Sequence, residues 1–176
     1  MRLKFCLAAL AATTVFASPA LAQTATASAV ADARGLVLER LTLTKVDNLD
    51  FGTIISDTLA AGTVIINEDT GFRTFTGGVT LVPTNDGGRG LFSGAGGFNQ
   101  TVLLTLAPPT FLVSTSNPAD MIAVNSMVLD NGALTSLRST GTTGTFQVGV
   151  GGNFAIAAAQ PNGFYKADFT VTADYQ

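Results

Sequence analysis

The sequence predicts an all-β fold, an antiparallel β-sandwich. All 19 glycines and five of the six prolines fall after residue 22, where they divide the chain into short pieces. Those pieces are rich in Thr, Val, Ile, Leu and Phe, a composition typical of strands. The longest stretch without Gly or Pro after residue 22, Leu36 to Phe51, alternates Leu and Thr at its centre instead of showing a helical period. Many short strands separated by turns favour a sandwich.

The composition excludes several kinds of chemistry. The 176 residues are 47% apolar and 12% charged, with no His or Trp and a single cysteine, Cys6. A Ser-His-Asp or Cys-His nucleophile, a Cys/His zinc site and a disulfide in the processed chain are therefore excluded. The few lysines and arginines are not clustered, which argues against binding to nucleic acid. We expect one domain that is not an enzyme and holds no metal or other cofactor.

Residues 1–22 have the features of a secretory signal peptide. Arg2 and Lys4 give a positive start, Phe5 to Ala17 is mostly apolar, and Ala20-Leu21-Ala22 is a small-residue cleavage site. The apolar run is short for a membrane span, although an uncleaved membrane anchor is the alternative. We expect export through the periplasm to the cell surface or the medium, without stable membrane insertion.

Residues 23–35 form an N-terminal extension with a period of two. One face of this extension, as a strand, consists of small side chains only: Ala25, Ala27, Ala29, Ala31 and Ala33. Such a face adds little to a core of its own. Two interpretations remain open: a flexible leader before the domain, or an arm that becomes a strand only against another molecule.

The domain is predicted over residues 36–176. Strands are expected at 62–67, 101–106, 121–129 and 145–150, with turns at Asp86-Gly87, Asn131-Gly132 and Asn162-Gly163. The Ser/Gly/Asn-rich stretches 85–90 and 93–97 are expected to be mobile loops. The run 149–152 is expected to be a bulge or bend between two strands. The Asp/Asn clusters at 47–50, 67–71 and 85–86 are typical of ordinary turns, and none follows an EF-hand pattern.

The last twelve residues show the clearest pattern. Residues 165–176 alternate strictly, which predicts one long strand with a buried face and a solvated face. The solvated positions are polar or charged. The predicted buried face consists of Tyr165, Ala167, Phe169, Val171, Ala173 and Tyr175.

An ordered set of short motifs resembles a bacterial secreted family called domain of unknown function 4402. The set covers essentially the whole processed chain. It consists of residues 41–45 (LTLTK), 49–54 (LDFGTI), 149–152 (GVGG), Gln160, Gly163, Tyr165 and 169–175 (FTVTADY). More distantly, residues 49–52 (LDFG) and the penultimate Tyr175 resemble subunits of the spore coat U type and of chaperone–usher fimbriae.

The distant resemblance implies an immunoglobulin-like sandwich that lacks one strand. It also implies that an N-terminal extension of the neighbouring subunit fills the gap, and that a periplasmic chaperone and an outer-membrane usher act beforehand. This chain departs from such subunits in two respects. Many of them have a disulfide, whereas the processed chain has no cysteine, and their donor strands usually carry larger apolar side chains than alanine. Five buried alanines give roughly 4 kcal/mol, whereas five Val or Leu side chains give roughly 8–15 kcal/mol. We therefore expect any strand exchange to recruit Leu36 and Leu38, or part of the strand at 41–43.

Two functions follow as hypotheses. The first is a structural subunit of a fimbria-like or other surface filament, joined head to tail by strand donation, because an unfilled groove invites an added strand. The second is a monomeric secreted binding module that contacts a glycan or another surface through its loops. The candidate residues are the arm, at Ala25, Ala27, Ala29, Ala31, Ala33, Leu36 and Leu38, and the inward face of the C-terminal strand as the surface for a chaperone or neighbour.

Overall fold

The computed structural model describes residues 26–176, and the chain divides into two units, 1–36 and 37–176. The predicted signal peptide and Ala25 lie outside the described residues. Residues 26–36 carry no strand or helix, and each is exposed.

Residues 37–176 contain all of the regular structure that is described. The strands are β1 (Thr42–Asp47), β2 (Ile54–Ser56), β3 (Gly62–Ile66), β4 (Arg73–Gly77), β5 (Val79–Leu81), β6 (Gly90–Ala95), β7 (Thr101–Ala107), β8 (Phe111–Ser114), β9 (Met121–Leu129), β10 (Thr135–Ser139), β11 (Thr145–Ile156), β12 (Tyr165–Lys166) and β13 (Thr170–Tyr175). A short 3-10 turn, η1, spans Gly141–Thr143.

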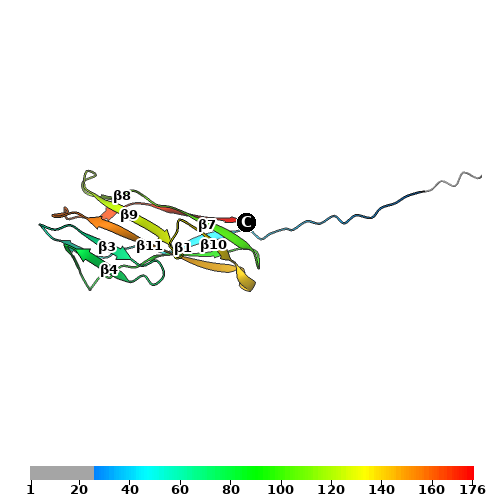
Figure 1. Cartoon of the computed structure of the whole chain (residues 1–176), viewed down its shortest axis with the longest axis horizontal. Coiled ribbons are helices and arrows are strands. Elements are labelled where there is room, and N and C mark those ends of the chain that lie inside the picture. Colours follow the sequence, from blue (N-terminus) through cyan, green and yellow to red (C-terminus); the bar gives the residue numbers. More distant parts are fainter. Residues whose placement is uncertain (1–25) are drawn as a thin grey trace, which may run out of the picture. The chain divides into compact units, whose positions relative to one another are not determined.

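The strands form an antiparallel β-sandwich, as the sequence predicts. The larger sheet has the order β1-β6-β11-β9-β8-β12, with the β3–β4 hairpin added to β11. The second sheet has the order β10-β7-β13, and β2 and β5 form a separate pair. Every pairing is antiparallel. Figure 1 shows β9 and β11 side by side, with β3 and β4 toward one end of β11 and β1 toward the other.

One apolar core joins the two sheets. The side chains of Val102, Leu104 and Leu106 on β7 are buried at every second position, as are those of Val148 and Val150 on β11. All five belong to a single cluster, with further members from β3, β5, β8 and β9. This alternation is the period expected of strands that have one face on a core.

Two glycine-rich segments, residues 93–95 and 149–152, belong to strands where a loop and a bend were expected, whereas residues 85–89 and 96–97 lie outside the strands. Residues 93–95 belong to β6, and a Cβ on Gly94 would overlap the ring of Phe146 on the adjacent β11. Residues 149–152 lie inside the twelve-residue β11, where side chains on Gly149 and Gly151 would overlap the backbone at Glu68 and Ile66. Glycine serves here to admit a neighbour at close range, since it has no Cβ.

The C-terminal twelve residues alternate between half-buried and exposed, as predicted, but they do not form one strand. β12 pairs with β8 in the larger sheet, whereas β13 pairs with β7 in the second sheet. The break at 167–169 lies opposite Pro108 and Pro109, which separate β7 from β8. Proline has no N–H to donate, so the ladder cannot continue across this point.

Candidate functional site

Several described strands have a hydrogen-bonded neighbour on one side only, and two stretches of such edge lie at the candidate site. Within residues 37–176, β13 pairs with β7 alone, β12 with β8 alone, and β1 with β6 alone. β1 and β13 approach each other, with Cα atoms within 8 Å, but they are not hydrogen-bonded to each other. The two sheets are therefore open to each other along one side.

The register assigns the unpaired backbone groups of β13. Gln176 donates its N–H to the carbonyl of Thr101 at 3.0 Å, which directs the backbone of residue 176 toward β7. Because hydrogen-bonding direction alternates along an antiparallel pair, the N–H and C=O groups of Val171, Ala173 and Tyr175 point away from β7. These are the same residues whose side chains face inward.

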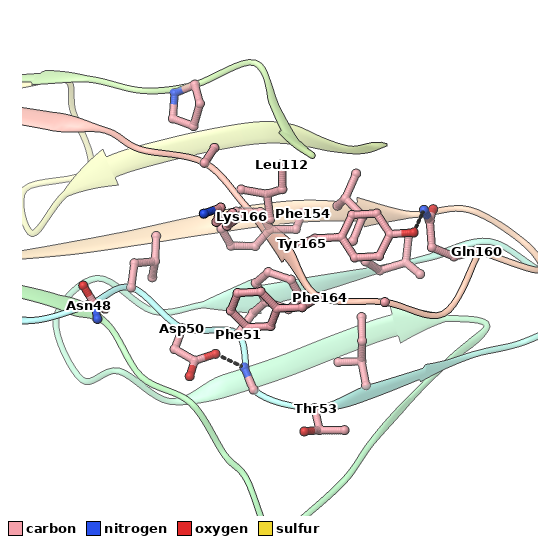
Figure 2. A pocket seen from close by; sticks show the side chains of 18 of the residues that line it. Asn48, Asp50, Phe51, Thr53, Leu112, Phe154, Gln160, Phe164, Tyr165 and Lys166 are labelled. Atoms are coloured by element: carbon pink, nitrogen blue, oxygen red, sulfur yellow. Dashed lines mark hydrogen bonds between the residues drawn. The ribbon is translucent and has the colours of Figure 1, made fainter. Parts of the chain in front are cut away.

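A groove of about 870 Å³ follows this opening. One wall consists of residues 48–56, and the other consists of residues 160–169. The floor is the apolar core itself, because Leu112, Ile122, Met127, Phe154 and Ile156, all of them buried residues, line it. Figure 2 shows aromatic side chains from both walls and the floor, among them Phe51, Phe154 and Tyr165.

Aromatic contacts connect the walls of the groove to its floor. The ring of Phe51 lies 5.1 Å from that of Phe154, and the ring of Phe169 lies 5.9 Å from that of Phe92 in an edge-on arrangement. Both separations are favourable for ring pairs. The charged side chains of the lining, Lys45, Asp50, Lys166 and Asp168, lie at exposed positions, so the groove has a polar rim and an apolar base.

Arg73 of β4 holds the first wall in place. Its side chain is 4% exposed, and its guanidinium donates to the carbonyl oxygens of Phe51 at 2.8 Å, Thr53 at 3.2 Å and Val82 at 2.9 Å. The carboxylate of Asp86 lies 3.4 Å away but is 80% exposed. The buried cation therefore has backbone carbonyls as its main partners, and it fixes a stretch of wall that lies outside any strand.

Two tyrosines hold the second wall. The hydroxyl of Tyr165 donates to the carbonyl of Pro161 at 2.7 Å and accepts from the amide of Gln160 at 3.0 Å (Figure 2 shows the contact with Gln160). The hydroxyl of Tyr175 donates to the carbonyl of Glu39 at 2.7 Å and accepts from the N–H of Gly97 at 2.6 Å. Each tyrosine thus ties one end of the C-terminal segment to a different part of the chain.

The candidate residues predicted from the sequence fall into two sets. Tyr165, Ala167 and Phe169 line the groove, and Val171, Ala173 and Tyr175 continue their face along β13. The arm residues Ala27, Ala29, Ala31, Ala33 and Leu36 belong to the other unit, where they are exposed and form no strand, and Leu38 is the second residue of the unit that holds the sheets. The structure thus brings the C-terminal set together on one face.

Sequence reasoning missed one wall of the groove and its anchor. Residues 49–54 entered only as part of a family motif, although Leu49 and Phe51 alternate in the same way as the C-terminal segment. Arg73 gave a usable signal, because it is the one charged residue in an otherwise uncharged strand, β4. A lone charge in a strand that joins a core suggests a buried partner.

The Asp/Asn clusters serve as turns, in agreement with the sequence analysis. The Asn67 side-chain oxygen accepts from the N–H groups of Asp69 and Thr70, and the Asp50 carboxylate accepts from the N–H of Gly52. Across residues 26–176, no three His, Cys, Asp or Glu side chains are grouped so that they could hold a metal ion. In the same range, no helix has the length and apolar character needed to cross a bilayer.

The chain belongs to the family described as Domain of unknown function (DUF4402), whose model matches residues 41–175. The match covers both walls of the groove, whereas the arm lies before it. A search of curated proteins and a search of solved structures each gave no match.

Proposed function

We propose that this protein is an exported structural subunit of a surface filament, in which the arm of one copy occupies the groove of the next. The observation that supports the proposal is the groove between residues 160–169, which include β12, and residues 48–56, with core side chains as its floor. An apolar floor between unpaired backbone edges suits an added strand, because a strand supplies both backbone hydrogen bonds and alternating side chains.

The lengths agree with this arrangement. Residues 26–36 extended at about 3.3 Å per residue would span about 36 Å, enough to run the length of the wall at residues 160–169. An arm strand would pair with the free edge of the C-terminal segment beyond the part where β1 and β13 come within 8 Å of each other. Each hydrogen bond so formed contributes about 1 kcal/mol net.

The arm can present only one of its faces to the groove. Ala27, Ala29, Ala31 and Ala33 share a face with Val37, whereas Leu36 and Leu38 lie on the opposite face. Using both sets would need a one-residue bulge at Arg34-Gly35. We therefore propose the alanine face as the inserted one, with backbone hydrogen bonds as the main source of affinity.

Assembly would need partners that cover the groove during export. An unpaired edge above an apolar floor invites aggregation, so a periplasmic chaperone that lends a strand, and an usher that exchanges it for the next arm, fit the proposal. Head-to-tail donation does not close on itself and therefore builds an open filament. The expected location is the periplasm in transit and then the cell surface or the medium.

A monomeric secreted binding module is the second candidate. It is favoured by the groove volume of about 870 Å³, which lies within the range of roughly 300–1,000 Å³ that is typical of ligand pockets. In that case the arm would be a leader, and the groove would bind its ligand in a single copy.

Deletion of residues 23–35 tests the proposal. The shortened protein should fold but form no filaments in negative-stain microscopy, and a synthetic peptide of residues 23–38 should raise its Tm. In matched peptides, Ala31→Asp on the inserted face should abolish this stabilisation, whereas Ser28→Asp on the outer face should not. A deletion that changes neither melting nor assembly would exclude strand donation and favour the binding module.

A further inference from the structure

The chain contains two Asn-Gly pairs, Asn131-Gly132 and Asn162-Gly163, and both are exposed. Asparagine is a thermolabile residue, and it is most reactive before glycine, which has no Cβ to hinder attack of its backbone nitrogen on the Asn side chain. The attack needs an Asn amide that is free to turn toward that nitrogen, and a backbone N–H that can lose its proton. Hydrogen bonds to either group therefore slow the reaction.

The first pair is held by hydrogen bonds at both reacting groups. The side-chain amide of Asn131 donates to the carbonyl of Thr135 at 2.9 Å, and its oxygen accepts from the N–H of Ala133 at 3.3 Å. The N–H of Gly132 donates to the carbonyl of Leu129 at 2.8 Å. The turn between β9 and β10 thus keeps the Asn131 side chain and the Gly132 nitrogen in fixed positions.

The second pair has none of these restraints. Across residues 26–176, neither the side chain of Asn162 nor the N–H of Gly163 has a hydrogen-bond partner. Both residues lie outside the strands, between β11 and β12, and both line the groove. Since both Asn-Gly pairs are exposed, their hydrogen bonds distinguish them and their access to water does not.

Fixed contacts enclose the second pair on both sides. The Tyr165 hydroxyl donates to the carbonyl of Pro161 at 2.7 Å, and the N–H of Thr115 donates to the carbonyl of Phe164 at 2.9 Å. The main chain between Pro161 and Tyr165 is therefore closed into a short loop. An extra main-chain atom within this loop has to displace it, and with it part of one wall of the groove.

We infer that Asn162-Gly163 is a site of spontaneous covalent modification, at which the folded chain converts Asn162 to isoaspartate or aspartate. The backbone nitrogen of Gly163 forms a bond to Cγ of Asn162, while the bond from Cγ to the side-chain nitrogen breaks. Ammonia leaves with the proton of the Gly163 N–H, and a cyclic imide remains.

Water completes the reaction by opening the imide at one of its two carbonyl carbons. Opening at the original main-chain carbon leaves the chain running through Cγ, which is isoaspartate, and opening at Cγ gives aspartate. The net change replaces an amide by a carboxylate, consumes water and releases ammonia, with no oxidant or reductant. Both products put a negative charge in the groove wall, and isoaspartate also lengthens the main chain there.

Ageing of the full processed chain tests the site. The protein is kept in neutral buffer, either native or in concentrated urea, and peptide mass spectrometry measures the deamidated fraction at Asn131 and at Asn162. In the native chain Asn162 should react at least about tenfold faster, which corresponds to about 1.4 kcal/mol of activation free energy. In urea the two rates should converge, because the hydrogen bonds are lost and both sequences are Asn-Gly.

Asn162→Gln is the matched control, because it keeps an exposed amide but would have to close a larger ring. An isoaspartate-specific methyltransferase should label the aged wild type strongly and the aged variant hardly at all. Equal rates at Asn131 and Asn162 in the native chain, or a difference that persists unchanged in urea, would overturn the inference, because the fold would then not set the rate.

Urea unfolding measures the displacement of the wall separately. The aged wild type should have a lower midpoint than the fresh protein, whereas aged Asn162→Gln should keep its midpoint. Freshly prepared Asn162→Asp should also keep it, because it adds the charge at an exposed position without the extra main-chain atom. An unchanged midpoint in extensively converted wild type, or an equal loss in aged Asn162→Gln, would contradict the displacement.

The reaction needs only the chain and water, so these measurements require no filaments. Absence of filaments would refute strand donation and leave the modification site standing. Absence of modification at Asn162 would refute the site and leave strand donation standing.

Discussion

Replacing Arg73 with Met tests how the wall at residues 51–53 is held. Methionine keeps most of the unbranched apolar stem of arginine and removes the guanidinium. The partly buried carbonyls of Phe51 and Val82 then lose their charged donor, and the carbonyl of Thr53 loses a longer hydrogen bond at an exposed position. The wall should become mobile without a large change in packing volume.

The expected loss of stability can be estimated from these contacts. A hydrogen bond to a charged group contributes about 1.5–3 kcal/mol, so the two shorter ones give about 3–6 kcal/mol. Water can replace the hydrogen bond to the Thr53 carbonyl. Local relaxation recovers part of the stability that is lost with the hydrogen bonds to Phe51 and Val82. We therefore expect destabilisation of about 3–5 kcal/mol, a large share of the roughly 5–15 kcal/mol that is typical of a whole domain.

Urea unfolding of the chain lacking 23–35 measures this change, and titration with the arm peptide measures the groove. Arg73→Met should lower the midpoint at nearly constant m-value and weaken peptide binding. Arg89→Met is the control, because Arg89 donates to the carbonyls of Glu68 and Asp69 away from the groove. A loss of stability below about 1 kcal/mol, or an equal loss of peptide binding in the control, would refute the assigned role of Arg73.

Three further predictions concern single sites. Tyr175→Phe keeps the ring but removes the hydrogen bonds of the hydroxyl to the backbone of Glu39 and Gly97, so it should cost about 1–3 kcal/mol; an unchanged urea midpoint would contradict a stabilising role for these two contacts. Gly94→Ala should lower the Tm by overpacking against Phe146, at a cost of about 1–3 kcal/mol or more, and a neutral result would refute the close contact. The N–H groups of Leu59 and Ala60 lower the pKa of Asp57 below 3.8, so its carboxylate stabilises the fold above that pH and loses this effect as the pH falls through the lowered pKa. Asp57→Asn should therefore melt below wild type at pH 6, with a gap that closes in acid, and a gap independent of pH would contradict the assignment.

Local patterns predicted some strands closely. β9 has the predicted bounds, Met121–Leu129, and the alternation of the C-terminal segment appears in its burial from Tyr165 to Gln176. In both segments the side chains on one face differ clearly from those on the other, so the two-residue period is visible in the sequence. The extent of β11 was not predictable in this way, because its four central residues include three glycines, which have no side chains to show a period.

The missed half of the groove has a related cause. Residues 48–56 are mostly outside strands, and their position depends on Arg73, which is more than fifteen residues away in the chain. The lone charge in β4 suggests that Arg73 has a buried partner, but no local pattern shows that the partner is the backbone of residues 51–53. Gly94 likewise suggested a loop by its composition, whereas its actual role is set by a ring on an adjacent strand.

The sequence by itself determined the all-β class, the inward face of the C-terminal segment and the alanine face of the arm, because each depends on side-chain alternation along a short piece of chain. Only the tertiary structure decided which edges stay unpaired and where the core is open. Those properties depend on the distances between segments such as 48–56 and 160–169, which are far apart in the chain and are brought together by the packing of the two sheets.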